Sequence, residues 1–259
     1  LCPEALHHYL TYGYVPHPLT MFRGIEKLPP GHFLLWNDGS ARIEEYWRPP
    51  FRCAPRRTEA EYAERLRDLL TEAVRLRLIS DVPLGAFLSG GIDSSIVVGL
   101  MSRLSNAPVK TFAIGFEEKR YDELAYARQV AEHFGTEHKE FVVRPNAVEI
   151  IPELVWHYDE PFADSSAIPT YYVSQITRRH VTVALTGDAG DEGFAGYPRH
   201  KAVKLGQWYD GLPGFLRRRL GGAAWEKLPA SVEYRTFRRR LRRLFEAMNL
   251  PPRERYVRW

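Results

Sequence analysis

The sequence predicts an α/β fold: a doubly wound, mostly parallel sheet, a helical C-terminal part and a small N-terminal β segment. Between residues 83 and 185, short apolar runs alternate with amphipathic helical segments, which is the pattern of strands joined by crossover helices. Two of the apolar runs are followed at once by Gly-rich segments. The chain is 44% hydrophobic and 26% charged, so it is able to bury the core that such a sheet needs.

The first 48 residues are rich in aromatic residues, Pro and Gly. Strand-like runs at 32–36 and 41–46 flank the turn signal Asn37-Asp38-Gly39 and predict a hairpin at the edge of a sheet. This part is too small to be stable alone. The Pro- and Arg-rich residues 49–57 then predict a linker.

Residues 58–259 form the main predicted domain. Thr58 and Glu61 make a capping-box pattern that opens a helix, and Gly135 is expected to end a later one. We expect strands at residues 83–88, 109–114, 137–143 and 181–185, and helices at residues 93–104, 121–134, 147–158 and 166–179. Past residue 200 the pattern becomes helical and basic. Ligands of such sheets bind beyond the carboxyl ends of the strands, where both Gly-rich segments fall.

Net charge and cysteine content give no support for a nucleic-acid-binding protein, a disulfide-rich protein or a cysteine metal site. The net charge of +4 does not by itself indicate nucleic acid. Arg clusters at 217–219 and 238–243 leave two interpretations open, an anionic partner such as RNA or a solvated helix face, and we favour the second. Cys2 and Cys53 form neither a disulfide framework nor a metal pair, and we interpret both as ordinary thiols of a reducing cytoplasm.

Targeting signals are absent from the sequence as well. No apolar run approaches the roughly 20 residues that span a bilayer, and no signal peptide is visible. We therefore expect a cytoplasmic protein without a membrane partner. The sequence opens in the middle of a pattern at Leu1, without an initiator Met, which indicates a fragment.

The segment from Ser89 to Ser95 carries the strongest chemical signal. An apolar strand ends at Leu88, two glycines allow a sharp turn, and a helix begins at once with its free N–H groups and positive dipole end at the turn. That arrangement binds phosphate groups. The carboxylate of Asp93 in the same place implies a bridging cation, for which Mg²⁺ is the usual choice.

No Lys follows the glycines, so the Walker-type phosphate loop does not fit. Ser89-Gly90-Gly91-Ile92-Asp93-Ser94-Ser95 resembles instead the signature of the PP-loop ATP pyrophosphatases, which cleave ATP between the α and β phosphates and form an adenylate. Matched residue by residue, the resemblance implies ATP contacts at Phe87, Leu88, Ser89, Gly90, Gly91, Asp93, Ser94, Ser95, Ile114, Thr186 and Gly187. Phe87 and Ile114 would flank the adenine, with packing in the core as the alternative reading.

Further motifs resemble glutamine-hydrolysing asparagine synthetases within this superfamily. They run from Thr111 to Phe116, from Asp159 to Ser166 and, most specifically, from Leu185 to Tyr197. Residues 12–16 and 27–32 resemble the end of the class II glutaminase domain of these enzymes. The resemblance implies a glutaminase remnant at 1–48 and a synthetase domain at 58–259 that is C-terminally incomplete.

The second Gly-rich segment holds three carboxylates, Asp188, Asp191 and Glu192, which repel one another unless a cation intervenes. The resemblance implies that Asp191, like Asp93, is a Mg²⁺ carboxylate. It ties Asp188 to formation of the aspartyl-adenylate; the family often has Glu there. Glu192 is expected to cap the following helix. Residues 159, 160, 164 and 165 are expected either to position substrate or to cap a helix.

The resemblance implies that aspartate, activated by ATP, reacts with ammonia from glutamine to give asparagine and AMP. A homodimer is left open, and nucleic acid is not expected as a partner. Three alternatives stay open: a related amidotransferase or β-lactam-type synthetase acting on another carboxylate, a tRNA-modifying PP-loop protein, and an inactive fragment that only binds.

Overall fold

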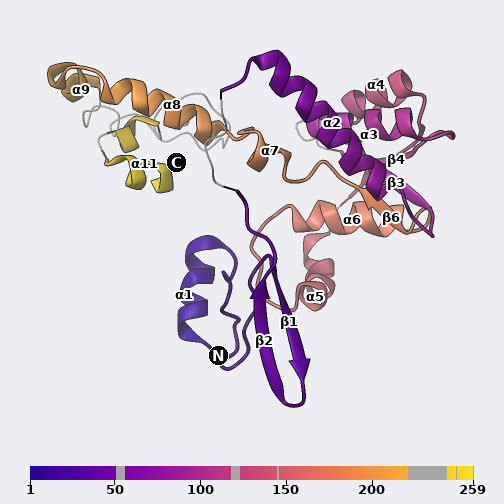
Figure 1. Cartoon of the computed structure of the whole chain (residues 1–259), viewed down its shortest axis with the longest axis horizontal. Coiled ribbons are helices and arrows are strands. Elements are labelled where there is room, and N and C mark those ends of the chain that lie inside the picture. Colours follow the sequence, from indigo (N-terminus) through magenta and orange to yellow (C-terminus); the bar gives the residue numbers. More distant parts are fainter. Residues whose placement is uncertain (51–55, 118–122, 145, 221–243, 249, 259) are drawn as a thin grey trace. The chain divides into compact units, whose positions relative to one another are not determined.

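A computed structural model describes residues 1–50, 56–117, 123–144, 146–220, 244–248 and 250–258. The chain divides into two compact units, Leu1–Gly187 and Asp188–Trp259 (Figure 1). Much of the predicted linker, with Cys53, and the Arg cluster at 238–243 lie outside the described residues. The first unit holds both sheets, and the described part of the second is helical.

The N-terminal part of the first unit begins with a helix that the sequence interpretation missed, α1 (Pro3–Tyr12). Its signals were present: Pro3 lies at the first helical position, and Gly13 ends the helix in the left-handed conformation at φ 81°. Ala5, Val15 and Met21 form a small buried cluster beside it. This segment therefore has an apolar core of its own.

The predicted hairpin is confirmed as β1 (His32–Asn37) and β2 (Ser40–Glu45). The two strands pair antiparallel, with His32 opposite Glu45. The turn works because Asp38 and Gly39 both take positive φ, 46° and 80°, as a two-residue hairpin turn requires. No third strand joins the hairpin among the described residues.

The capping box predicted at Thr58 is confirmed at the start of α2 (Glu59–Arg77). The Thr58 hydroxyl accepts a hydrogen bond from the Glu61 N–H at 3.3 Å, and the Glu61 carboxylate accepts one from the Thr58 N–H at 2.7 Å. These bonds satisfy donors that the first helical turn leaves open.

The central sheet confirms the predicted fold class. Its four strands are β3 (Leu84–Phe87), β4 (Lys110–Phe116), β5 (Glu137–Val143) and β6 (Val183–Leu185). They lie in the order β5-β4-β3-β6, and every neighbouring pair is parallel. The expected strands are confirmed, and no end differs by more than two residues.

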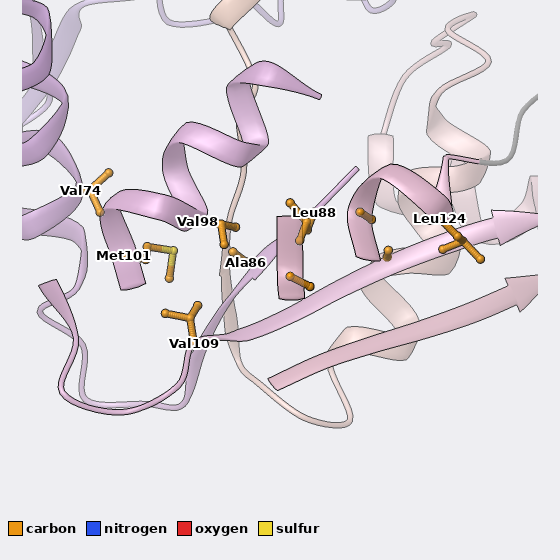
Figure 2. Packing of buried hydrophobic residues seen from close by; sticks show 10 residues of the cluster. Val74, Ala86, Leu88, Val98, Met101, Val109 and Leu124 are labelled. Atoms are coloured by element: carbon orange, nitrogen blue, oxygen red, sulfur yellow. The ribbon is translucent and has the colours of Figure 1, made fainter. Parts of the chain in front are cut away.

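Helices cover both faces of this sheet. They are α3 (Ile92–Leu104), α4 (Leu124–Phe134) and α6 (Ala167–Thr177), and α5 (Ala147–Tyr158) packs on α6. In Figure 1, α2, α3 and α4 lie on one side of the strands and α6 on the other. Val74 of α2, Val98 and Met101 of α3, and Leu124 of α4 pack with strand residues in one buried cluster (Figure 2).

The strand order creates a switch point between β3 and β6. From β3 the chain moves outward through β4 to β5, and it then returns to the other side of β3 as β6. Crossovers leave such a point in opposite directions, which opens a crevice at the carboxyl ends of the two strands. Both Gly-rich segments follow these two strands.

The second unit contains α7 (Gly190–Gly193), α8 (Pro198–Asp210), α9 (Gly214–Leu220) and α11 (Pro252–Arg258). The predicted helical C-terminal part is thus confirmed for the described residues. Arg255 is buried and donates two hydrogen bonds to the Asp210 carboxylate, at 3.0 and 2.8 Å, which lowers the pKa of Asp210. This pair ties α11 to the end of α8.

Across the described ranges, the structure contains no helix that is both long and apolar enough to cross a membrane.

Candidate functional site

The turn from β3 into α3 is shaped by Gly90. Its φ is +79°, a conformation that side chains strongly disfavour. A Cβ at this position would lie 2.5 Å from the carbonyl carbon of Tyr126 and 2.6 Å from the amide nitrogen of Ala127, both backbone atoms of α4. The loop therefore lies directly against the first turns of α4, and a residue with a side chain has no room there.

The serine hydroxyls hold the loop in shape. Ser89 Oγ lies 3.0 Å from Ser94 Oγ and accepts from the Gly91 N–H at 3.2 Å. Ser94 and Ser95 both donate to the Gly91 carbonyl oxygen, at 3.2 and 2.7 Å. Ser94 is buried, so its hydroxyl is part of the loop's internal network.

Helix α3 begins right after this loop, with Gly91 as its N-cap residue. Asp93 lies in the first turn, is half-buried, and is the acidic residue of that turn. A helix N-terminus beside a glycine turn presents backbone N–H groups and the positive end of the helix dipole, which together favour an anion. The arrangement thus has the local features that phosphate binding requires.

Gly187, which follows β6, reaches the same helix end. A Cβ there would lie 2.6 Å from the Ser94 amide nitrogen and 2.8 Å from the Asp93 carbonyl carbon. Gly187 and the start of α3, about 90 residues apart in the chain, therefore lie together at the switch point of the sheet. Gly187 thus lies beside the first turn of α3, next to the loop at residues 89–91.

A pocket of about 230 Å³ opens at the carboxyl ends of β3 and β4. Four of the predicted ATP contacts, Phe87, Leu88, Ser89 and Ile114, lie in its wall. The remaining lining residues are Phe112, Ala113 and Phe116 of β4, Glu123 and Ala127 at α4, and Pro169, Thr170 and Val173 of α6. Its wall is mostly apolar, which suits a flat aromatic ligand.

The sequence interpretation missed the wall that α6 contributes. Pro169, Thr170 and Val173 lie about 80 residues beyond the loop, in a helix without a recognisable ligand motif. Their spacing of i, i+1 and i+4 puts them on one face of the helix. Only the packing of α6 on β4 makes them part of the site.

The acidic segment after β6 belongs to the second unit and is described by itself. Asp188 and Asp191 are exposed. Gly196 donates its N–H to the Asp191 carbonyl oxygen at 3.0 Å, and a Cβ there would lie 1.8 Å from Asp191 Oδ1. Gly196 thus leaves room for the Asp191 side chain in this conformation.

One expectation for this segment was wrong. Glu192 does not cap α8, whose N-cap residue is Tyr197 and whose cap has no side-chain hydrogen bond. The Glu192 carboxylate accepts a hydrogen bond from the Tyr197 hydroxyl instead, and this lowers the pKa of Glu192. The Glu192 carboxylate is thus bonded to a tyrosine five residues later in the chain and does not cap the helix.

The segment between α5 and α6 contains two carboxylates that have structural partners. Asp164 accepts the Ser166 N–H at 2.8 Å just before α6, whose N-cap residue is Ser166. Glu160 forms an ion pair with Lys27. Glu160 contacts the N-terminal segment, and the bond that the Asp164 carboxylate accepts comes from the N-cap residue, so it does not cap the free N–H groups of α6.

No cluster of three or more His, Cys, Asp or Glu that could hold a metal occurs in the part of the chain that the structure describes. Mg²⁺ sites of nucleotide enzymes need only one or two carboxylates plus substrate phosphates. A half-buried carboxylate at the anion-favouring end of α3, as Asp93 provides, is compatible with such a site.

Comparison with known proteins decides the family. The sequence profile of the family described as asparagine synthase matches residues 65–258. The chain belongs to the asparagine synthase family. Residues 65–258 include both Gly-rich segments, the pocket of about 230 Å³ and the described part of the second unit.

Curated relatives agree with this family. An asparagine synthetase [glutamine-hydrolyzing] 1 of Bacillus subtilis strain 168 is 36% identical over 84% of this chain and 34% of its own length. A putative asparagine synthetase [glutamine-hydrolyzing] 2 of Methanocaldococcus jannaschii is 39% identical over 83% of this chain and 42% of its own. The matched part of the chain thus covers less than half the length of either relative.

One of the proteins that the chain resembles has a different kind of name. A protein named Amidase chry2, from Gibberella zeae, is 30% identical over 73% of this chain and 31% of its own length. Similarity to this chain is therefore not confined to proteins named asparagine synthetase.

Proposed function

We propose that this chain forms the ATP-dependent amide-ligase part of an asparagine synthetase. The observation that carries the proposal is the switch point, where the glycine turn before α3, Gly187 and an apolar pocket lie together. The pocket is smaller than the roughly 300–1,000 Å³ of drug-sized ligand sites, so it suits the base of a nucleotide. The phosphates would then lie on the loop outside it.

The proposed reaction has two steps. The side-chain carboxylate of aspartate attacks the α-phosphorus of ATP, the bond to the β-phosphate oxygen breaks, and pyrophosphate leaves. Ammonia then attacks the acyl carbon of the β-aspartyl-AMP, loses a proton, and displaces AMP to give asparagine. Water would compete for the adenylate, so the second step requires a site from which water is excluded.

The loop residues have distinct proposed roles. Backbone N–H groups of the turn at Gly90 and at the N-terminus of α3 would stabilise the charge of the departing pyrophosphate. Phe87 and Ile114 would flank the adenine, and Thr186 and Gly187 would contact the ribose or the α-phosphate. Support comes from the shared pocket wall and from the close approach of Gly187 to Ser94.

The proposed roles of the carboxylates are taken from the motif resemblance. Asp93 and Asp191 would hold Mg²⁺, which neutralises phosphate charge when bound. Asp188 would take part in forming the adenylate, and acceptance of a proton from ammonia is a second role for it. Its side chain is one methylene shorter than the Glu that the family often has there.

Ammonia is proposed to come from glutamine, released by a class II glutaminase domain of which residues 1–48 would be the end. The names of the two synthetases described above include glutamine hydrolysis, which supports this source. We propose a cytoplasmic location on the same resemblance.

The test is aspartate-dependent exchange of labelled pyrophosphate into ATP, followed by added ammonium with detection of asparagine and AMP. We expect exchange with aspartate, and its loss in Asp93→Asn. Asp68→Asn, which changes an exposed carboxylate on α2, is the matched control and should exchange normally. If aspartate supports no exchange but another carboxylic acid does, asparagine formation is refuted. The proposal that the chain forms an acyl-adenylate would then still stand.

A second acceptor carboxylate is favoured by one observation, the relative that is named an amidase. The same exchange assay over a panel of carboxylic acids distinguishes the two candidates, because only the true acceptor forms an adenylate.

A further inference from the structure

The N-terminal segment, residues 1–47, contacts the loop between α5 and α6, residues 159–166. The Lys27 ammonium forms an ion pair with Glu160 and also donates to the Val15 carbonyl oxygen at 2.5 Å. The Ala163 N–H donates to the Gly13 carbonyl oxygen at 2.8 Å. Two separate contacts, one ionic and one between backbones, thus join parts of the chain that lie more than 130 residues apart.

The ion pair is substantially shielded from water. The exposed fraction is 30% for the Lys27 side chain and 25% for the Glu160 side chain. Shielded pairs are screened less by salt than surface pairs, and removing one partner leaves the other charge without its counterion. By contrast, the pair Arg48–Glu45 in the hairpin region has an Arg side chain that is 79% exposed.

The loop that receives these contacts leads directly into the pocket wall. Asp164 holds the chain just ahead of α6, through hydrogen bonds from Ser166 and Ala167 at 2.8 and 3.2 Å. α6 begins at Ala167, and the pocket residues Pro169, Thr170 and Val173 follow within two turns. A shift of the loop at Glu160 would therefore be carried into the wall that faces the nucleobase.

We propose that the Lys27–Glu160 ion pair is a positioning contact through which the N-terminal segment sets α6, so that nucleotide affinity depends on the N-terminal segment. The inference rests on the proposed function, because it takes the pocket at β3 and β4 as the nucleotide site. Neither residue touches the pocket itself; Glu160 acts through the loop, and Lys27 acts through Glu160.

The test measures binding of α,β-methylene-ATP with Mg²⁺ by calorimetry, on protein that contains all of residues 1–259. We expect Lys27→Met and Glu160→Gln each to weaken binding on the order of fivefold or more, as is typical of coupling between distinct sites. The double variant should lose no more than the larger single loss, because both changes remove the same contact. Lys27→Arg, which keeps the charge, should bind within twofold of the unchanged protein.

Thr58→Ala is the control for general destabilisation. It removes the capping box of α2, within the same unit and outside the pocket, so it should lower the melting temperature without changing affinity. Equal affinity in the unchanged protein and in both single variants would overturn the coupling, as would losses that simply add in the double variant. If the unchanged protein itself binds no nucleotide, it is the proposed function that fails.

Discussion

Replacing Gly90 by Ala tests whether the loop is built as the structure indicates. The new methyl group meets two penalties. The backbone at φ +79° disfavours any side chain by about 1–2 kcal/mol, and a Cβ would lie 2.5 Å from the Tyr126 carbonyl carbon. Because Tyr126 C and Ala127 N are backbone atoms, α4 cannot yield by rotating a side chain.

The second penalty sets the magnitude. Forcing an extra methyl into a packed site costs about 1–3 kcal/mol, so the total loss is about 2–5 kcal/mol. That is a large part of the roughly 5–15 kcal/mol by which native proteins are stable. The measurement is urea denaturation followed by circular dichroism, together with nucleotide binding by calorimetry.

Gly135→Ala provides the matched control. Gly135 has a similar positive φ of 62°, but a Cβ there would meet no atom within 4 Å. Gly135→Ala should lower the free energy of unfolding only by the cost of the positive φ, about 1–2 kcal/mol, and the variant should still bind nucleotide. If Gly90→Ala and Gly135→Ala destabilise equally and both bind nucleotide, then the loop does not press on α4 and the reasoning is refuted.

Three further predictions concern other positions. Gly187→Ala puts a Cβ 2.6 Å from the Ser94 amide nitrogen, so the rate of pyrophosphate exchange should fall about a hundredfold. An unchanged rate would contradict the close approach of Gly187 to the start of α3. Burial lowers the pKa of His138, so the unfolded chain binds more protons than the folded one, and stability should fall as the pH drops below about 6.5. In a profile of melting temperature against pH, His138→Gln should flatten this fall. A variant profile parallel to that of the unchanged protein would contradict the role of His138. Thr58→Ala should cost about 1 kcal/mol in urea denaturation, and no loss would mean that the capping box does not stabilise α2.

Local features of the site were predictable because they depend on few neighbours. The turn at residues 89–91 needs glycine for its backbone angle, and the helix after it follows from the residues that come next. The same holds for the capping box at Thr58 and the turn at Asp38 and Gly39. In each of these cases the physical constraint lies within a few residues of the chain.

Errors arose where a local signal had to compete. The pattern of aromatic residues, Pro and Gly hid α1, although Pro3 and Gly13 mark its ends. Glu192 was expected to cap a helix, but its carboxylate accepts a hydrogen bond from the Tyr197 hydroxyl instead. A carboxylate bonds to whichever donor the fold brings nearest, and the sequence alone does not rank those donors.

By itself, the sequence determined the glycine turn, the carboxylates that follow it in the chain, and the strand–helix alternation that places the turn at the end of a parallel strand; it predicted phosphate binding at that turn. Only the tertiary structure decided which distant residues join them. The order β5-β4-β3-β6 brings Gly187 to Ser94, packing of α6 on β4 supplies a pocket wall, and Lys27 meets Glu160 across more than 130 residues. These contacts follow from how whole elements bury their apolar faces against one another, a cooperative outcome that no short stretch of sequence encodes.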